Sequence, residues 1–168
     1  QGCQVYFIGK VGNDSFGQKL KDGFIDTSVD TSQILTDSGN SGMSVAILED
    51  SGQYGALIVS EANSRIRKED IHITENSGIL LMQNEIPEDI NIYAAKKAKQ
   101  KGCEVWLNAA PSRALNSELL SLLDVIIINR VESDFYGSFL LLNPTKKLTK
   151  ITTFGQKGVQ VVLPTKEP

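Results

Sequence analysis

The chain has 168 residues, 40% of them hydrophobic, with 17 basic and 20 acidic residues and a formal net charge of −3. This length and apolar content predict one α/β unit with a single core over residues 1–168. No basic run could neutralise a phosphate backbone, so we expect no nucleic acid partner. No apolar run approaches the roughly 20 residues of a membrane helix, so we expect no membrane partner.

The two cysteines, Cys3 and Cys103, lie beside apolar runs and take part in no Cys-x-x-Cys or Cys/His pattern. This context favours buried, reduced thiols over a disulfide or a metal site. A reducing cytoplasm is therefore the expected location.

The chain begins with a predicted strand, a glycine loop and a helix. The apolar run Val5–Ile8 stops at Gly9, as a buried strand would. Ser15 and Gln18 form a capping-box pattern, which predicts a helix from Ser15 to about Phe24.

The loop before this helix resembles a phosphate-binding P-loop, because Gly12 and Gly17 are five residues apart. A P-loop, however, has Lys directly after its second Gly and then Ser or Thr. Here Gln18 follows Gly17, and Lys19 comes one position late. We therefore favour a tight turn over a phosphate cradle.

A hairpin is predicted over residues 42–60, with the arms Met43–Leu48 and Tyr54–Val59 joined by a turn at Glu49–Gln53. Neither arm alternates cleanly between apolar and polar residues. Each face of the hairpin should therefore be covered by the core, a ligand or another subunit.

The second half alternates strands and helices. Strands are predicted at Ile79–Met82, Val105–Leu107, Val125–Ile128, Ile151–Thr153 and Val159–Val162. One helix begins at Pro87 and ends at Gly102, and Asn116 caps a second that runs to Leu123. The fold class is α/β: a parallel sheet with flanking helices in three layers, and a projecting hairpin. Ligands bind such sheets at the carboxyl ends of the strands.

Polar residues follow several of these strands. Glu85 directly follows a strand and precedes a helix, so its carboxylate could bind substrate hydroxyls, act as a general base, or complement the helix dipole. Asn108 ends the next strand. Asn129 and Glu132, three apart at a strand-to-helix turn, could hold a hydrated magnesium ion near phosphates or could cap the helix.

Two glycines, Gly155 and Gly158, follow the strand that ends at Thr153. They could expose backbone N–H groups in a concave nest suited to phosphate, or they could simply form a hairpin turn. The sequence leaves both readings open.

Several of these blocks together resemble the ribokinase (PfkB) family of carbohydrate kinases. Residues 7–17 are similar to its Ile-Gly-x-Val-Gly-x-Asp-x-Phe-Gly block, 80–87 to Leu-Leu-Leu-Gln-x-Glu-x-Pro, and 107–111 to Leu-Asn-Pro-Ala-Pro. Residues 124–132 are similar to Asp-x4-Asn-x-x-Glu, and 153–158 to Thr-x-Gly-x-x-Gly. The blocks occur in family order over nearly the whole chain.

The resemblance implies transfer of the γ-phosphoryl group of ATP to a hydroxymethyl group of ribose or a similar sugar. It implies that Glu85 holds sugar hydroxyls, and that Ser44 and Ala46 cover the sugar as part of a hairpin lid. Asn129 and Glu132 would position phosphates and Mg²⁺-bound water, while Thr153 and Gly155 would meet the nucleotide phosphates. Whether K⁺ activates the protein is left open. Lid hairpins of this family often pair between subunits, which implies a homodimer through residues 42–60.

The resemblance also implies parts that this chain does not contain. The family's first strand and sugar motif would precede Gln1, and the Gly-Ala-Gly-Asp segment with the catalytic base would follow Pro168, together with the rest of the ATP-binding part. The connection between Asn129 and Thr153 is shorter than usual by about one helix. This chain alone is therefore not expected to catalyse, and the alternative is a non-catalytic sugar- or nucleotide-sensing module of the same fold.

Overall fold

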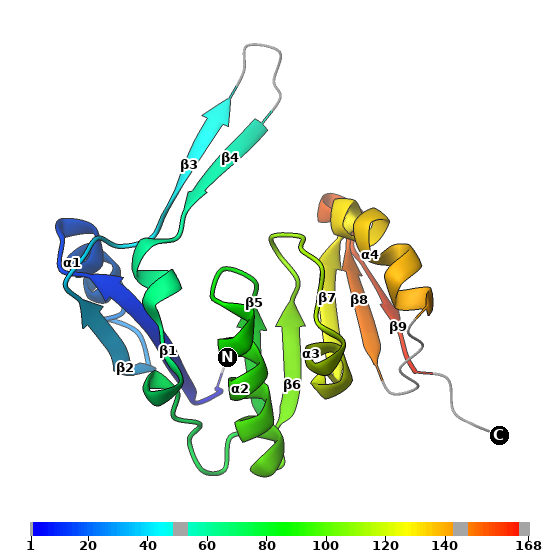
Figure 1. The fold of residues 1–168 in the computed structure, drawn as a ribbon, viewed down its shortest axis with the longest axis horizontal. Helices are drawn as coiled ribbons and strands as arrows, with labels where there is room; N and C mark the ends of the chain where they lie inside the picture. The colour runs from blue at the N-terminus through cyan, green and yellow to red at the C-terminus, as the bar shows by residue number, and fades with distance from the viewer. Residues whose placement is uncertain (1, 49–53, 143–147, 165–168) are drawn as a thin grey trace. The chain divides into compact units, whose positions relative to one another are not determined.

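The computed structural model describes residues 2–48, 54–142 and 148–164. The chain divides into two compact units, Gln1–His72 and Ile73–Pro168, where the length alone suggested one. Figure 1 shows the elements of both units, which are described separately below.

The second unit is built on a five-stranded sheet in the order β5-β6-β7-β8-β9. The strands are β5 (Ile79–Gln83), β6 (Glu104–Asn108), β7 (Val125–Asn129), β8 (Thr149–Thr153) and β9 (Val159–Val162). The first four are parallel, and β9 pairs antiparallel with β8 at the edge. The five predicted strands and the mostly parallel sheet are confirmed.

Helices flank this sheet (Figure 1): α2 (Glu88–Gln100) packs on β5 and β6, α3 (Ser117–Leu122) packs on α2, and α4 (Arg130–Leu142) packs on β7 and β8. Gly102, at φ 75°, follows α2, and the Asn116 side chain accepts from the Glu118 N–H to cap α3, as predicted. Helix α4 begins at the strand-to-helix turn that the Asn129 and Glu132 spacing indicated, although its length was not predicted. It occupies most of the connection between Asn129 and Thr153, which the sequence suggested was shorter than usual by about one helix.

The core of the second unit is formed by β-strand side chains with helix side chains packed on them. Leu107 and Ile126 from neighbouring strands, Leu119 from α3 and Tyr136 from α4 are all at most 1% exposed. Each such burial contributes about 1.5–3 kcal/mol. The carboxyl ends of the strands are therefore held in place by a well-packed core.

The first unit starts with β1 (Val5–Gly12), α1 (Ser15–Asp22) and β2 (Val29–Asp37), in which β2 lies parallel to β1. The hairpin follows as β3 (Met43–Leu48) and β4 (Tyr54–Val59), then two short 3₁₀ turns, η1 (Glu61–Arg65) and η2 (Lys68–Asp70). The predicted helix and hairpin arms are confirmed, whereas β2 was missed. The first predicted strand is present but continues to Gly12, and the expectation that it is buried is wrong, since Val5 and Phe7 are 44% and 45% exposed. The predicted turn at Glu49–Gln53 lies outside the described residues.

The start of α1 corrects one expectation. Asp14, not Ser15, is the N-cap, and its Oδ1 accepts from the Gly17 N–H at 2.7 Å. The glycines of this loop allow close backbone approach. A Cβ on Gly12 would lie 2.2 Å from the Ser41 nitrogen, and one on Gly17 would lie 2.1 Å from the Gly12 carbonyl oxygen. This packing accounts for the glycine spacing that resembled a P-loop.

The two cysteines differ from each other. Both are free, and Cys103 is buried as expected, but Cys3 is exposed, so the expectation of two buried thiols is wrong for Cys3. Within the described ranges, no helix is long and apolar enough to cross a membrane.

Candidate functional site

The carboxyl ends of the parallel strands in the second unit bring most of the predicted site residues to one edge of the sheet. Asn108, Asn129 and Thr153 are the last residues of β6, β7 and β8, and Glu85 lies two residues beyond β5. Asn129 and Thr153 are register partners on adjacent strands, so their Cα atoms face each other across the ladder. The sheet edge thus presents two amides, a hydroxyl and a carboxylate.

Glu85 lies in the turn between β5 and α2 and is half-buried. No hydrogen bond or ion pair joins its side chain to any other described residue, although Arg, Lys and amide groups are common in this part of the chain. A half-buried carboxylate without a protein partner keeps its acceptor sites for something outside the chain. Its position therefore fits a ligand-binding role better than a purely structural one.

Asn129 and Glu132 form a reciprocal capping box at the start of α4. The Glu132 N–H donates to Asn129 Oδ1 at 2.9 Å, and the Asn129 N–H donates to Glu132 Oε2 at 2.7 Å. Helix capping, one of the two readings of this pair, is thus observed. Glu132 is 6% exposed, and its Oε1 makes no hydrogen bond to another described residue. That oxygen remains available to a water molecule.

Direct metal ligation has less support. In the part of the chain that the structure describes, no three His, Cys, Asp or Glu side chains gather as a metal site. At the end of β7, the Asn129 and Glu132 pair offers a single carboxylate, and Mg²⁺ usually keeps several of its waters because it dehydrates reluctantly.

The turn after β8 contains Thr153, half-buried, and the 3₁₀ turn η3 (Gly155–Lys157). Gly155 and Gly158 have φ values of 58° and 94°, which an L side chain rarely adopts. The N–H groups of Phe154, Lys157 and Gly158 donate to carbonyls inside the turn. The nest could therefore offer a phosphate at most the N–H groups of Gly155 and Gln156.

The hairpin of the first unit carries Ser44 and Ala46, both exposed. Residues directly opposite in an antiparallel ladder share a face, so Ser44 lies beside Ile58, its register partner. The other face is apolar and exposed: Met43, Val45, Ile47 and Leu57 are 42%, 45%, 54% and 58% exposed. The two faces of the hairpin therefore differ in chemistry.

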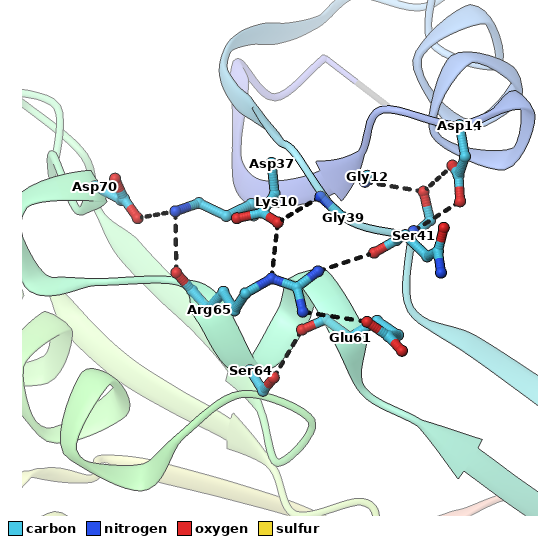
Figure 2. A network of polar contacts seen from close by, with 11 residues as sticks. Lys10, Gly12, Asp14, Asp37, Gly39, Ser41, Glu61, Ser64, Arg65 and Asp70 are labelled. Carbon is cyan, nitrogen blue, oxygen red and sulfur yellow. Dashed lines mark hydrogen bonds and ion pairs between the residues drawn. The ribbon is translucent and has the colours of Figure 1, made fainter.

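The root of the hairpin is held by a polar network within the first unit (Figure 2). Ser41, 1% exposed, donates its hydroxyl to Asp14 Oδ1 at 2.6 Å and its N–H to Asp14 Oδ2 at 2.8 Å, and it accepts from the Gly12 N–H at 2.9 Å. These hydrogen bonds lower the pKa of Asp14. They tie the beginning of β3 to the loop between β1 and α1.

A second part of the same network joins the far side of the hairpin root (Figure 2). Arg65 pairs with Asp37 at 2.7 Å and with Glu61 at 3.1 Å, and Lys10 pairs with Asp70 at 2.6 Å. The Gly39 N–H also donates to Asp37 and, as the largest cause, lowers the pKa of that carboxyl. Both segments that lead into the hairpin are therefore fixed to the body of the first unit.

Three polar residues near Glu85 were missed by sequence reasoning: the buried Asn84 and Tyr136, and the half-buried Arg113. Asn84 is 4% and Tyr136 1% exposed, and the Tyr136 hydroxyl donates to the Arg113 carbonyl at 2.8 Å and accepts from the Arg113 N–H at 3.0 Å. Burial raises the pKa of Tyr136, so its hydroxyl keeps its proton at neutral pH. No local motif marks these residues, because they come from three separate segments.

A mostly parallel sheet with polar groups at its strand ends, flanking helices and a separate hairpin is the arrangement expected of a sugar kinase of the kind the sequence resembles. The chain belongs to the pfkB family of carbohydrate kinases, whose model matches residues 1–166.

Proteins similar to this chain include ribokinases. A ribokinase of Haemophilus influenzae is 33% identical over 168 residues, which cover 96% of this chain and 55% of the relative. An Arabidopsis thaliana ribokinase is 32% identical over 137 residues, covering 76% of this chain and 36% of the relative. The solved structure of Arabidopsis thaliana ribokinase complexed with ribose and ATP matches with a TM-score of 0.82 at 27% identity, over 98% of this chain and 60% of that one. The chain thus spans about half the length of the curated relatives that it matches.

Proposed function

We propose that the protein to which this chain belongs is an ATP-dependent sugar kinase that transfers the γ-phosphoryl group to a hydroxymethyl group of ribose or a similar sugar. The observation that carries the proposal is Glu85. It is a half-buried carboxylate at a strand end of a pfkB-family sheet, without a hydrogen bond or ion pair to another described residue. A site built to hydrogen-bond hydroxyls needs such free acceptors, because they discriminate strongly against ligands that lack the hydroxyls.

The sugar contacts are proposed for Glu85 in the second unit and for Ser44 and Ala46 on the hairpin of the first. The exposed Ser44 side chain offers a hydroxyl, and Ala46 two residues on offers a small apolar surface on the same face. Each of these groups by itself suits a sugar: a carboxylate or a hydroxyl can bind ligand hydroxyls, and a methyl group can contact an apolar ring face. A lid of this kind would also exclude water, which competes as a phosphoryl acceptor.

The nucleotide contacts are proposed for Asn129, Thr153 and Gly155, with Glu132 positioning magnesium through water. Mg²⁺ would supply charge neutralisation of the phosphate oxygens. Glu132 can serve this role while its other oxygen keeps the start of α4 in place. In phosphoryl transfer such positioning counts for more than covalent chemistry by the protein.

The hairpin is also proposed as a homodimer contact. Its apolar face exposes four large apolar side chains next to one another: Met43, Val45, Ile47 and Leu57. A contiguous exposed apolar patch of this kind is typical of an interaction surface. Ser44 and Ala46 lie on the opposite face, so sugar covering and subunit pairing need not compete for the same side chains. A cytoplasmic location, where Cys3 and Cys103 stay reduced, is proposed as well.

The test is an ADP-release assay of the full-length protein with ATP and Mg²⁺ across a panel of pentoses, hexoses and nucleosides. Turnover with ribose or a related sugar, and a phosphorylated product by mass spectrometry, is the expected result. Absence of turnover with every sugar and nucleoside would overturn the proposal. Tight sugar binding in calorimetry without any turnover would favour the sensing module instead.

A further inference from the structure

The turn that carries Glu85 is clamped on both sides by the segment that follows β6. On one side, the Asn84 N–H donates to the Ala110 carbonyl at 3.0 Å and the Asn84 side-chain Nδ2 donates to the Pro111 carbonyl at 3.1 Å. On the other side, Arg113 Nη1 donates to the Ile86 carbonyl at 3.1 Å. Both sequence neighbours of Glu85 are thus held, while Glu85 itself is not.

The clamping segment is in turn held by α4. The Tyr136 hydroxyl donates to the Arg113 carbonyl at 2.8 Å and accepts from the Arg113 N–H at 3.0 Å, so it fixes the backbone of Arg113 through both of its polar groups. Asn84 Nδ2 also lies 3.4 Å from the same hydroxyl. One phenol, 1% exposed, therefore connects the Glu85 turn, the Arg113 segment and α4.

If Arg113 served only to hold the turn in place, its partly buried charged side chain would lower the stability of the protein without any functional gain. Its Nε and Nη2 are buried and have no hydrogen-bond partner among the described residues, and no carboxylate there forms an ion pair with it. A buried polar group without a partner lowers stability, and a cation more than a neutral group. Such local costs cluster at functional sites, where geometry matters more than stability.

We infer that Tyr136 and Arg113 are positioning residues that hold the Glu85 carboxylate in the direction required to bind the sugar. The inference rests on the proposed function. Among the residues that the structure describes, none bonds to the Glu85 carboxylate and orients it, so the backbone of its turn determines where that carboxylate points. On one side of that backbone the Ile86 carbonyl is held by Arg113. On the other, Asn84 contacts the segment that follows β6 and lies 3.4 Å from the Tyr136 hydroxyl.

The test uses the full-length protein with the changes Tyr136→Phe, Glu85→Ala and both together. Tyr136→Phe removes only the hydroxyl and should raise the sugar KM about tenfold, with less than about a twofold change in the ATP KM. In the Glu85→Ala background the same change should alter the sugar KM by less than about twofold, because the group that it positions is gone. Tyr93→Phe is the matched control, since the Tyr93 hydroxyl makes no hydrogen bond to another described residue.

Arg113→Met keeps the test decisive if Tyr136→Phe folds poorly. It retains the apolar stem and removes the two unpartnered buried nitrogens, so the thermal midpoint should stay the same or rise while the sugar KM rises. Equal increases in sugar and ATP KM, or a Tyr136→Phe effect that is just as large without Glu85, would overturn the inference alone. Absence of any wild-type turnover would instead overturn the proposed function, and the inference with it.

Discussion

Asp14 binds Ser41 through both of its carboxylate oxygens, with Oδ1 2.6 Å from the Ser41 hydroxyl oxygen and Oδ2 2.8 Å from the Ser41 nitrogen (Figure 2). The same carboxylate caps α1 through the Gly17 N–H. One aspartate thus fixes the start of a helix and the root of the hairpin together. A bidentate contact, with both carboxylate oxygens bonded, restricts rotation of the hairpin root more than a single hydrogen bond would.

Removing the Ser41 hydroxyl should destabilise the first unit. Ser41→Ala leaves the Gly12 N–H, buried beside Ser41, without its acceptor, and it removes one of the hydrogen bonds to Asp14. The expected loss is about 1–3 kcal/mol in the free energy of unfolding, measured by urea denaturation of the full-length protein. Ser64→Ala, which removes an exposed hydroxyl that donates to the Glu61 carbonyl, is the control and should cost far less. Equal losses would contradict the buried network.

Acid should weaken the same network. Hydrogen bonds, first of all that from the Ser41 hydroxyl, lower the pKa of Asp14 below its ordinary value of 3.8. A lowered folded-state pKa gives stability that is present above pH 3.8 and is lost as the pH falls through the still lower folded value. Asp14→Asn should therefore be less stable at neutral pH yet lose less stability on acidification. Urea midpoints at a series of pH values between neutral and strongly acidic check this, and parallel curves for the two proteins would refute it.

Glu85→Ala should impair sugar binding selectively. The change removes a carboxylate that bonds to no other residue in the described part of the chain, so it leaves no described buried group unpaired and the thermal midpoint should hardly move. The sugar KM should rise at least about tenfold, with the ATP KM nearly unchanged, since a missing hydrogen bond to a substrate hydroxyl has large effects on that substrate alone. Glu75→Ala, which removes an exposed carboxylate paired with Lys101 near the start of β5, is the matched control. Equal effects on both substrates would count against the role of Glu85.

Glu132→Gln separates helix capping from magnesium positioning. The amide oxygen of glutamine can still accept from the Asn129 N–H, so the capping box and the thermal midpoint should survive. The charge is lost, however, and the magnesium concentration needed for half-maximal rate should rise by about tenfold or more. Asn129→Ala, in contrast, removes the helix cap and should lower the free energy of unfolding by about 1 kcal/mol. If Glu132→Gln needs the same magnesium concentration as the wild type, Glu132 only caps the helix and does not position magnesium.

The sequence predicted β5, β6 and β7 because each contains an apolar run, and parallel buried strands need apolar side chains on both faces. It missed β2 (Val29–Asp37) because that strand is mostly polar and half-exposed. It indicated the start of α4 through the Asn129 and Glu132 spacing but not the length of the helix, which begins directly after β7 with Asn129 as the last strand residue and as the cap. Local patterns also could not find Tyr136, whose partner Arg113 is 23 residues away.

Charge on the apolar face of the hairpin should dissociate the proposed dimer. Val45 is 45% exposed on the face that also carries Met43, Ile47 and Leu57, and a glutamate there would be buried at a subunit contact without a partner. Val45→Glu should therefore sediment as a monomer where the wild-type full-length protein sediments as a dimer. Ile58→Glu makes the same kind of change on the opposite face, beside Ser44, and should keep the dimer. A dimer that survives Val45→Glu, or that is lost equally with both changes, would mean that this face of the hairpin does not join the subunits.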